Sequence, residues 1–283
     1  MTFDVHQAVT NSIIATLEAG ETGTWQCPWH RKGGSLPNNA LTGRPYRGIN
    51  TLMLWCAEQT HGYGDTRWAT YKQWAELGAQ VRKGERSTII TFFKELGEDE
   101  DGKRRFVARA SYGFNAAQVE GAPEAGEPFP ASEWNLPEVF DGFVERTGAR
   151  ITHGGDAAFY LPSEDRIVMP PRDRFPTAQG YASTMAHEFT HWSGAKGRLD
   201  RDLTGRFKTQ AYAAEELIAE LGSAFLCAEL GLEAEPHPTH ASYLASWLKL
   251  LRSDPKAIFT AASAASRAAG YLTSLQAQMA EAA

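Results

Sequence analysis

The chain has 283 residues, of which 42% are hydrophobic and 22% charged, and its formal net charge at pH 7 is −6. This composition is typical of a globular protein, the apolar runs are too short to span a bilayer, and the negative charge argues against a protein that coats nucleic acid over its whole surface. The cysteines at positions 27, 56 and 227 lie far apart and are odd in number, so they predict no disulfide framework and favour the reducing cytoplasm.

The N-terminal segment predicts an amphipathic helix rather than a signal peptide. It lacks a basic start and a small-residue cleavage site. Apolar residues recur every four positions from Val5 to Leu17, which is the spacing of one face of a helix. We expect Thr2 to cap this helix and Gly20 to end it.

The pattern that follows predicts a small α+β domain in residues 1–121. Asn50 is expected to cap a second helix, and Thr70 is expected to cap a short third one. The segments 87–96 and 105–115 are rich in β-branched and aromatic residues, which favours two strands. The charged stretch "GEDEDGK" between them makes a hairpin the expected connection.

Aromatic and basic residues are concentrated in this first part of the chain. Up to Gln118 there are 14 Lys and Arg against 12 Asp and Glu, a net charge of +2, whereas the rest has 14 against 22, a net charge of −8. Aromatic faces can stack on unpaired bases while cations follow the phosphates, so this composition is compatible with single-stranded DNA. The alternative is that the tryptophans are core residues and the cations are ordinary solvated charges. The candidate DNA-binding residues are Trp25, Trp29, Arg44, Tyr46, Arg47, Trp68, Lys72, Arg82 and Lys83.

A stretch rich in Pro, Ala and Gly at residues 119–133 has no apolar period and indicates a linker. We place the linker itself at residues 122–133 and a second domain at residues 134–283. There, "AFYLP" and "DRIVMPP" predict two short strands, and two longer helices are expected at about residues 177–194 and 209–231. The C-terminal part is also expected to be helical, so this domain is α+β and helix-rich.

The sequence "HEFTH" contains the pattern H-E-x-x-H. His187 and His191 are four residues apart, so on a helix both imidazoles face one side and can bind the same cation. Glu188 is turned by about 100° around the axis, where it can act as a general base toward water. The next helix carries Glu216 and Glu220 among small residues, and buried carboxylates require a partner. We therefore expect Glu216 to complete the ligand set and Glu220 to bind the outer nitrogen of a ligand histidine.

The residues leave several features of this site open. Glu215 is the alternative third ligand, which a shift in register would favour. Two histidines and a glutamate suit Zn²⁺, with Mn²⁺ and Ni²⁺ as alternatives. The strand at residues 165–171 is expected to bind an extended substrate by edge pairing. Four side chains are candidate donors to a developing oxyanion, and the sequence does not rank them: Tyr181, Tyr212, His153 and Arg198.

The chain resembles the ArdC family of antirestriction proteins over nearly its whole length, through five segments in the same order: "LTGRPYRGINTLML", "WATYKQWAELGAQVRKGE", "FNAAQVEG", "HEFTHWSG" and "YAAEELIAELGSAFL". The resemblance implies a single-stranded-DNA-binding domain followed by a zincin-like (gluzincin-type) metallopeptidase domain. It also implies His187, His191 and Glu216 as metal ligands and Glu188 as the base.

The expected function is therefore the protection of incoming plasmid or phage DNA from host restriction. The expected partners are single-stranded DNA and either a host protein substrate or the restriction machinery, with no membrane. Two alternatives remain. The first is a DNA-binding protein whose metal site is only structural, and the second is a metallopeptidase whose N-terminal domain binds protein.

Overall fold

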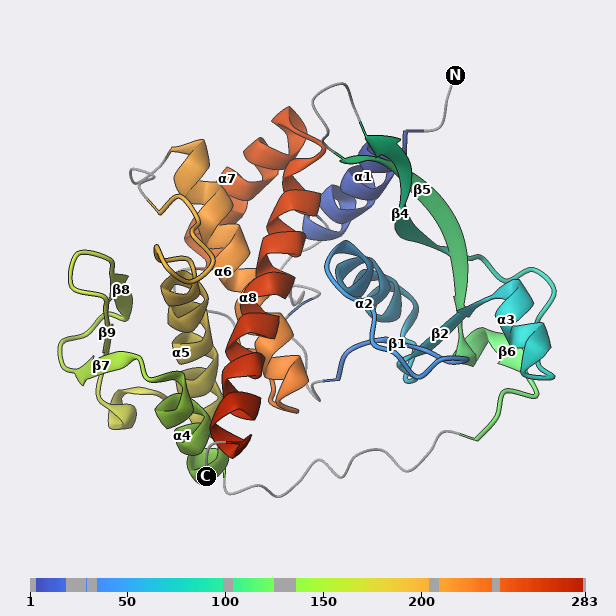
Figure 1. Ribbon diagram of the computed structural model, residues 1–283. Helices are drawn as coiled ribbons and strands as arrows, with labels where there is room; N and C mark the ends of the chain where they lie inside the picture. The colour runs from blue at the N-terminus through green and yellow to red at the C-terminus, as the bar shows by residue number, and fades with distance from the viewer. Residues whose placement is uncertain are drawn as a thin grey trace. The chain divides into compact units, whose positions relative to one another are not determined.

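The computed structural model describes residues 4–18, 29, 35–98, 104–124, 136–203, 209–235 and 240–281. The chain divides into two compact units (Figure 1). Unit 1 comprises Met1–Pro28 and Leu36–Gly126, and unit 2 comprises Trp29–Ser35 and Glu127–Ala283. Trp29, which the sequence places in the first domain, therefore belongs to unit 2. Within the described residues, no helix has the length and hydrophobicity needed to cross a membrane.

The described part of unit 1 packs helices against a four-stranded sheet with the strand order β1-β2-β5-β4. The strands of this sheet are β1 (Asn38–Asn39), β2 (Arg67–Thr70), β4 (Thr88–Glu98) and β5 (Arg104–Asn115). The helices are α1 (Val5–Glu18), α2 (Ile49–His61) and α3 (Tyr71–Glu76). A separate two-stranded sheet pairs β3 (Gln80–Val81) with β6 (Val119–Glu120).

The core of unit 1 contains tryptophan side chains that the sequence could not assign to either the core or a DNA-binding surface. Trp68 is fully buried beside Leu54 of α2 and Ile90 of β4, and its Nε1 donates to Glu58 Oε1 over 2.9 Å. Trp74 is also fully buried, and its Nε1 donates to the carbonyl of Phe114 over 3.0 Å. Because each indole N–H has a partner, burial of these rings leaves no unsatisfied donor.

Two expectations for unit 1 are confirmed by local hydrogen bonds and pairing. Thr70 caps α3 in a capping box with Gln73, in which each side chain binds the backbone N–H of the other residue. β4 and β5 form the expected antiparallel hairpin, with a β-bulge between Glu95 and Gly97. The content of β-branched and aromatic residues and a charged connection were sufficient to predict it.

The N-terminal caps of α1 and α2 differ from the expected ones. Asp4 caps α1, since its Oδ1 accepts from the backbone N–H groups of the next turn; Thr2 and Gly20 lie outside the described residues. Asn50 does not cap α2, which begins after Gly48. Its side chain instead donates to the carbonyl of Thr91 over 2.8 Å and accepts from the N–H of Thr91 over 2.7 Å. Asn50 thus satisfies the backbone at the free edge of β4.

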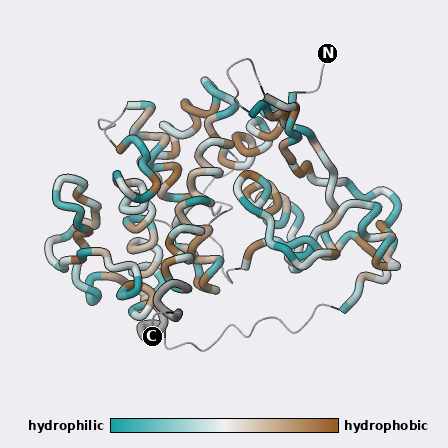
Figure 2. Tube along the Cα trace, viewed as in Figure 1, coloured by the Kyte–Doolittle hydropathy of each residue, from teal (hydrophilic) through white to brown (hydrophobic). Residues whose placement is uncertain are grey.

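The described part of unit 2 is dominated by helices, and one small sheet lies beside α5 (Figure 1). The helices are α4 (Leu136–Thr147), α5 (Ala178–Ser193), α6 (Gln210–Glu229), α7 (His240–Ser253) and α8 (Ala257–Glu281). The strands are β7 (Arg150–His153), β8 (Phe159–Leu161) and β9 (Arg166–Met169), in the order β7-β9-β8. Figure 2 shows hydrophobic residues along the helices and more hydrophilic ones in the loops.

The two helices that the sequence places around the candidate site are confirmed. Thr177 caps α5 by accepting from the N–H of Gly180 over 2.9 Å, and Thr209 caps α6 by accepting from the N–H of Tyr212 over 3.2 Å. The helices approach each other closely at Gly222, where a Cβ atom would lie 2.5 Å from Cγ2 of Thr190. A glycine at this position therefore sets the separation of α5 and α6.

The expected role of β9 as an edge strand is wrong. β9 is the central strand, paired in parallel with β7 and antiparallel with β8, so both of its edges are occupied. β7 and β8 are the edge strands of this sheet, and the β8 residues Phe159 and Tyr160 line the cavity that contains the candidate metal ligands.

Candidate metal centre

The two histidines of α5 and one glutamate of α6 converge on a common point. The ring centroids of His187 and His191 are 4.9 Å apart. Nε2 of His187 lies 3.5 Å from Oε2 of Glu216, and Nε2 of His191 lies 3.8 Å from Oε1 of the same carboxylate. One potential ligand atom from each of these residues lies within 4.8 Å of the others. Two imidazoles and a carboxylate in this arrangement could hold one divalent cation.

The outer nitrogen of each histidine faces its own carboxylate. Nδ1 of His187 lies 3.6 Å from Oε2 of Glu220, and Nδ1 of His191 lies 3.1 Å from Oε1 of Glu215. Such partners fix the ring orientation and the tautomer of a metal-ligating histidine. Glu220 therefore occupies the supporting position expected from the sequence. Glu215, the alternative third ligand, faces the outer side of His191 instead of the convergence point.

Arg201 holds Glu215 in place, and no pattern in the sequence predicted this role. Its guanidinium donates to both carboxylate oxygens of Glu215, over 2.9 and 3.2 Å, and to Ser193 Oγ over 3.1 Å. A Cβ atom on Gly194 would lie 2.8 Å from Cζ of Arg201, so a larger residue at position 194 would require the guanidinium to shift. Arg201 follows α5 in a loop, and no spacing rule connects it to α6.

The imidazoles of α5 and the carboxylates of α6 shift one another's pKa values. Burial disfavours a charged imidazole, but the carboxylates of Glu216 and Glu220 outweigh it and raise the pKa of His187 to about 10. Burial also disfavours a charged Glu216, yet the neighbouring imidazoles hold the pKa of this carboxyl below its usual range. In the absence of a cation, a proton on His187 thus neutralises part of the negative charge.

Glu188 is buried beside the ligand set, on the wall of the cavity that contains it. Only 3% of Glu188 is exposed, and burial raises its pKa above the usual range for a glutamate. The cavity has a volume of about 280 Å³. A carboxyl whose pKa is raised toward neutrality can accept and return a proton efficiently at physiological pH.

Two tyrosines complete the cavity. Tyr212 of α6 hydrogen-bonds to Glu216, and its hydroxyl lies 2.9 Å from that of Tyr243 of α7. Burial raises the pKa of Tyr212, so its phenol stays protonated and can act as a donor. Tyr212 is therefore the one residue of the four oxyanion candidates that lines the cavity. Tyr243 was not a candidate, because nothing in the sequence places α7 beside α6.

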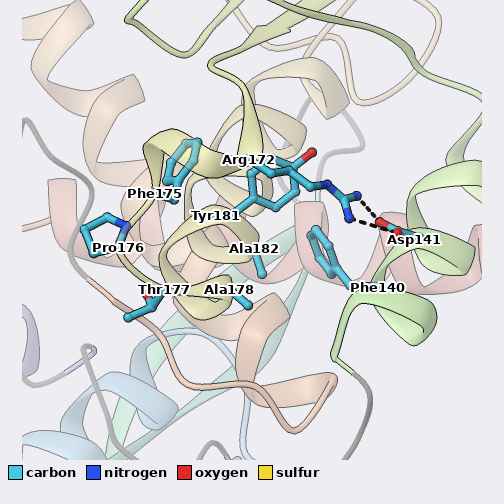
Figure 3. A pocket seen from close by; sticks show the side chains of 9 residues that line it. All are labelled: Phe140, Asp141, Arg172, Phe175, Pro176, Thr177, Ala178, Tyr181 and Ala182. Atoms are coloured by element: carbon cyan, nitrogen blue, oxygen red, sulfur yellow. Dashed lines mark hydrogen bonds and ion pairs between the residues drawn. The ribbon is translucent and has the colours of Figure 1, made fainter.

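Tyr181, His153 and Arg198 lie elsewhere. The hydroxyl of Tyr181 lies 2.9 Å from Nε2 of His153, and Arg198 contacts Asp165 and the ring of Trp192. Tyr181 lines a second cavity of about 210 Å³ between α4 and the start of α5, with Arg172 over its ring. Figure 3 shows Arg172 paired with Asp141 at this cavity, so its cation is already neutralised.

The structure contradicts two of the candidate DNA-binding residues. Trp29 and Trp68 are fully buried, and a buried ring offers no face to a base. Trp29 lies in unit 2, with its ring centroid 6.4 Å from that of Trp247. Trp25 lies outside the described residues.

The other candidates differ in their exposure and in their partners. Tyr46 is half-buried and its hydroxyl donates to the carbonyl of Trp68 over 3.4 Å. Arg82 donates to Glu85 over 2.7 Å, which neutralises its charge. Arg44, Arg47 and Lys83 are exposed, and Lys72 is exposed but lies 4.0 Å from Glu76 Oε1.

Comparisons with known proteins match both units. The family model of the N-terminal domain of anti-restriction factor ArdC matches residues 3–125, and that of a zincin-like metallopeptidase matches residues 138–264. The crystal structure of the antirestriction ArdC protein from plasmid R388 superposes with a TM-score of 0.80 at 40% identity, over 98% of this chain and 99% of that one. Its Mn(II)-bound form gives a TM-score of 0.80 at 39% identity, over 97% and 99% of the two chains.

Relatives identified by sequence are similar over almost the whole chain. The uncharacterized protein y4eC of Sinorhizobium fredii is 43% identical, over 96% of this chain and 92% of its own length. Two proteins of Escherichia coli named DNA primase TraC are 38% identical over 96% of this chain. The matched region covers only 20% and 27% of those two primases.

Proposed function

Because this chain belongs to the ArdC family of antirestriction proteins, we propose that unit 1 binds single-stranded DNA and that unit 2 is a zinc-dependent metallopeptidase. The biological role in this proposal is protection of incoming plasmid or phage DNA from host restriction. Protection arises either from shielding of the bound strand or from cleavage of a host protein that the bound DNA brings close.

One observation carries the metallopeptidase half of the proposal. The Nε2 atoms of two histidines face one carboxylate, while each Nδ1 faces a separate glutamate. This donor set fits a divalent metal, and the Mn(II)-bound relative supports the same conclusion. The fit would be poor for a structural zinc site, which normally has four protein ligands, because only three converge among the described residues.

A zinc ion held by three protein ligands supplies Lewis acidity and lowers the pKa of water to about 7. Glu188 accepts the proton of the attacking water and returns it to the leaving amine. Tyr212 and Tyr243 present hydroxyl donors to the cavity, where charge develops on the substrate carbonyl oxygen. The edge strand β8 offers backbone groups to an extended peptide beside this cavity.

The DNA-binding half rests on the family and on the relatives. The N-terminal family model covers unit 1, and the relatives named DNA primase contain the whole module as a minor part of their length. The name of these relatives favours DNA as the partner.

Two variants of the full chain test the metallopeptidase half. Glu188→Gln removes the proton acceptor but leaves the three ligands, and His187→Ala removes a ligand. We expect both to lose protection of transferred DNA, while only His187→Ala loses Zn²⁺ or Mn²⁺ in metal analysis. Full protection by Glu188→Gln with metal and fold intact would show that the site has only a structural role.

Binding of a fluorescein-labelled oligothymidylate to the full chain tests the DNA half. We expect affinity that falls as salt rises, because phosphate contacts release counterions. Absence of binding at low salt would contradict this half and favour a protein-binding role for unit 1.

A further inference from the structure

The hairpin of β4 and β5 carries exposed aromatic side chains that its own unit does not cover. Phe92, Phe93 and Phe106 are 50%, 54% and 54% exposed. Isolated exposed apolar residues are common, but aromatic residues gathered on one hairpin indicate an interaction surface. From the sequence, this hairpin was expected only as a structural element.

The register separates the exposed residues onto two faces. Phe92 pairs directly with Arg109 and Lys94 pairs with Val107, so these side chains share one face. Arg105 lies two residues before Val107 and four before Arg109, which places it on the same face. We name the set Phe92, Lys94, Arg105 and Arg109 the Phe92 face. Phe93, Arg104 and Phe106 alternate to the opposite side and form the Phe93 face.

The Phe92 face begins where the helical cover of the sheet ends. Ile90, two residues before Phe92 on the same face, is buried against Leu54 of α2. Beyond Ile90 the side chains of Phe92, Lys94, Arg105 and Arg109 are exposed. α2 therefore covers the base of this face and leaves the part toward the tip open to solvent.

The charge of the Phe92 face is one-sided. It has three cations and no carboxylate as far as the bulge at Glu95, and Glu95 itself lies on the other face. In the part of the chain that the structure describes, none of these three cations forms an ion pair. An aromatic ring directly opposite an arginine, with two further cations beyond this pair toward the tip of the hairpin, matches a chain of phosphates with unpaired bases.

We infer that the Phe92 face is the surface on which unit 1 binds single-stranded nucleic acid, with Phe92 stacking on a base and Lys94, Arg105 and Arg109 contacting phosphates. This inference rests on the proposed function and specifies its site. It moves the binding surface from the loops favoured by the sequence to the hairpin. Alternate residues on a strand are about 7 Å apart. The cations of the Phe92 face are therefore spaced along the hairpin so that they can contact successive parts of an extended nucleic-acid backbone.

Adjacent positions on the hairpin supply a matched control. Phe92→Ala combined with Arg109→Gln alters the Phe92 face, whereas Phe93→Ala combined with Arg104→Gln makes the same chemical change on the opposite face. All four side chains are exposed, so both variants of the full chain should keep the wild-type circular dichroism and melting temperature.

Fluorescence anisotropy with a labelled oligothymidylate at several salt concentrations is the measurement. We expect the Phe92-face variant to raise Kd by about tenfold or more. The slope of log K against log salt should also become shallower by about 0.7 for the lost phosphate contact. The Phe93-face variant should match the wild type in both quantities.

The outcomes separate this inference from the proposed function. The wild type binding the oligonucleotide while both variants bind it equally well, or lose the same amount of affinity, would overturn the assignment of the Phe92 face. Single-strand binding itself would remain supported. Absence of wild-type binding would instead contradict the proposed function itself. Wild-type binding to anionic phospholipid vesicles in preference to the oligonucleotide would overturn nucleic acid as the ligand of this face.

Discussion

Replacing Gly222 by alanine should weaken metal binding although Gly222 touches no ligand. The added Cβ atom would lie 2.5 Å from Cγ2 and 2.6 Å from Oγ1 of Thr190. Carbon atoms normally approach to about 3.5–4.0 Å, so α5 and α6 must separate locally by about 1 Å. Thr190 is fully buried between His187 and His191 in the sequence of α5, and it therefore has no room to move aside.

The magnitude follows from the cost of overpacking a buried contact, which is about 1–3 kcal/mol. In the metal-free variant the helices relax apart, and binding of the metal must bring Glu216 back toward the two histidines. The strain then appears in the binding free energy, so the Mn²⁺ affinity should fall by about 5- to 150-fold. The melting temperature of unit 2 should fall as well.

Isothermal titration with Mn²⁺ and thermal unfolding measure these effects. Gly270→Ala is the matched control, because Gly270 lies in α8 with no heavy atom within 4 Å of the place that the added methyl group would take, and the alanine should stabilise the helix slightly. Thr190→Ala combined with Gly222→Ala removes the clashing atoms and should recover part of the affinity. If Gly222→Ala binds Mn²⁺ and unfolds as Gly270→Ala does, the packing of these helices does not set the ligand geometry.

Three further predictions concern the same site. Mn²⁺ affinity should rise by roughly tenfold per pH unit between about pH 6 and about pH 8, because the pKa of His187 is raised to about 10 and its proton must leave before a metal binds. Titration in buffers of different ionisation enthalpy should detect the released proton, and a pH-independent affinity would contradict this prediction. Arg201→Gln should lower metal affinity by about 10- to 100-fold, because Glu215 loses the two hydrogen bonds that Arg201 donates, while Arg198→Gln, outside the site, should leave it unchanged in the same titration. Tyr243→Phe should leave metal affinity intact but slow cleavage of a peptide substrate by about tenfold or more, and an unaltered cleavage rate would remove Tyr243 from the catalytic cavity.

The sequence was most informative where local hydrogen bonds and spacing determine structure. Thr177, Thr209 and Thr70 each cap the helix that follows them, because the side-chain and backbone partners are three residues apart. His187 and His191 lie on one side of α5 for the same reason, since four residues make about one helical turn. These parts of the site required no knowledge of the tertiary structure.

The sequence was least informative where partners are distant along the chain. β1 and β3 have two residues each, and their pairing strands lie about 30–40 positions away. Arg201 reaches Glu215 through a loop, and Asn50 binds Thr91 41 positions away. Composition also could not distinguish a core tryptophan such as Trp68 from one that stacks on bases, because both are large and aromatic.

The burial of Trp29 has a consequence for any attempt to divide this chain. A cut near Gly126 would leave residues 127–283 without the indole that packs beside Trp247, a loss comparable to a Trp→Ala substitution of about 3–5 kcal/mol. The C-terminal fragment would therefore have a cavity in its core. Gene fusions or domain exchanges that divide the chain only at this boundary would contain the same cavity. An exchange that keeps this interior intact must carry Trp29 together with residues 127–283.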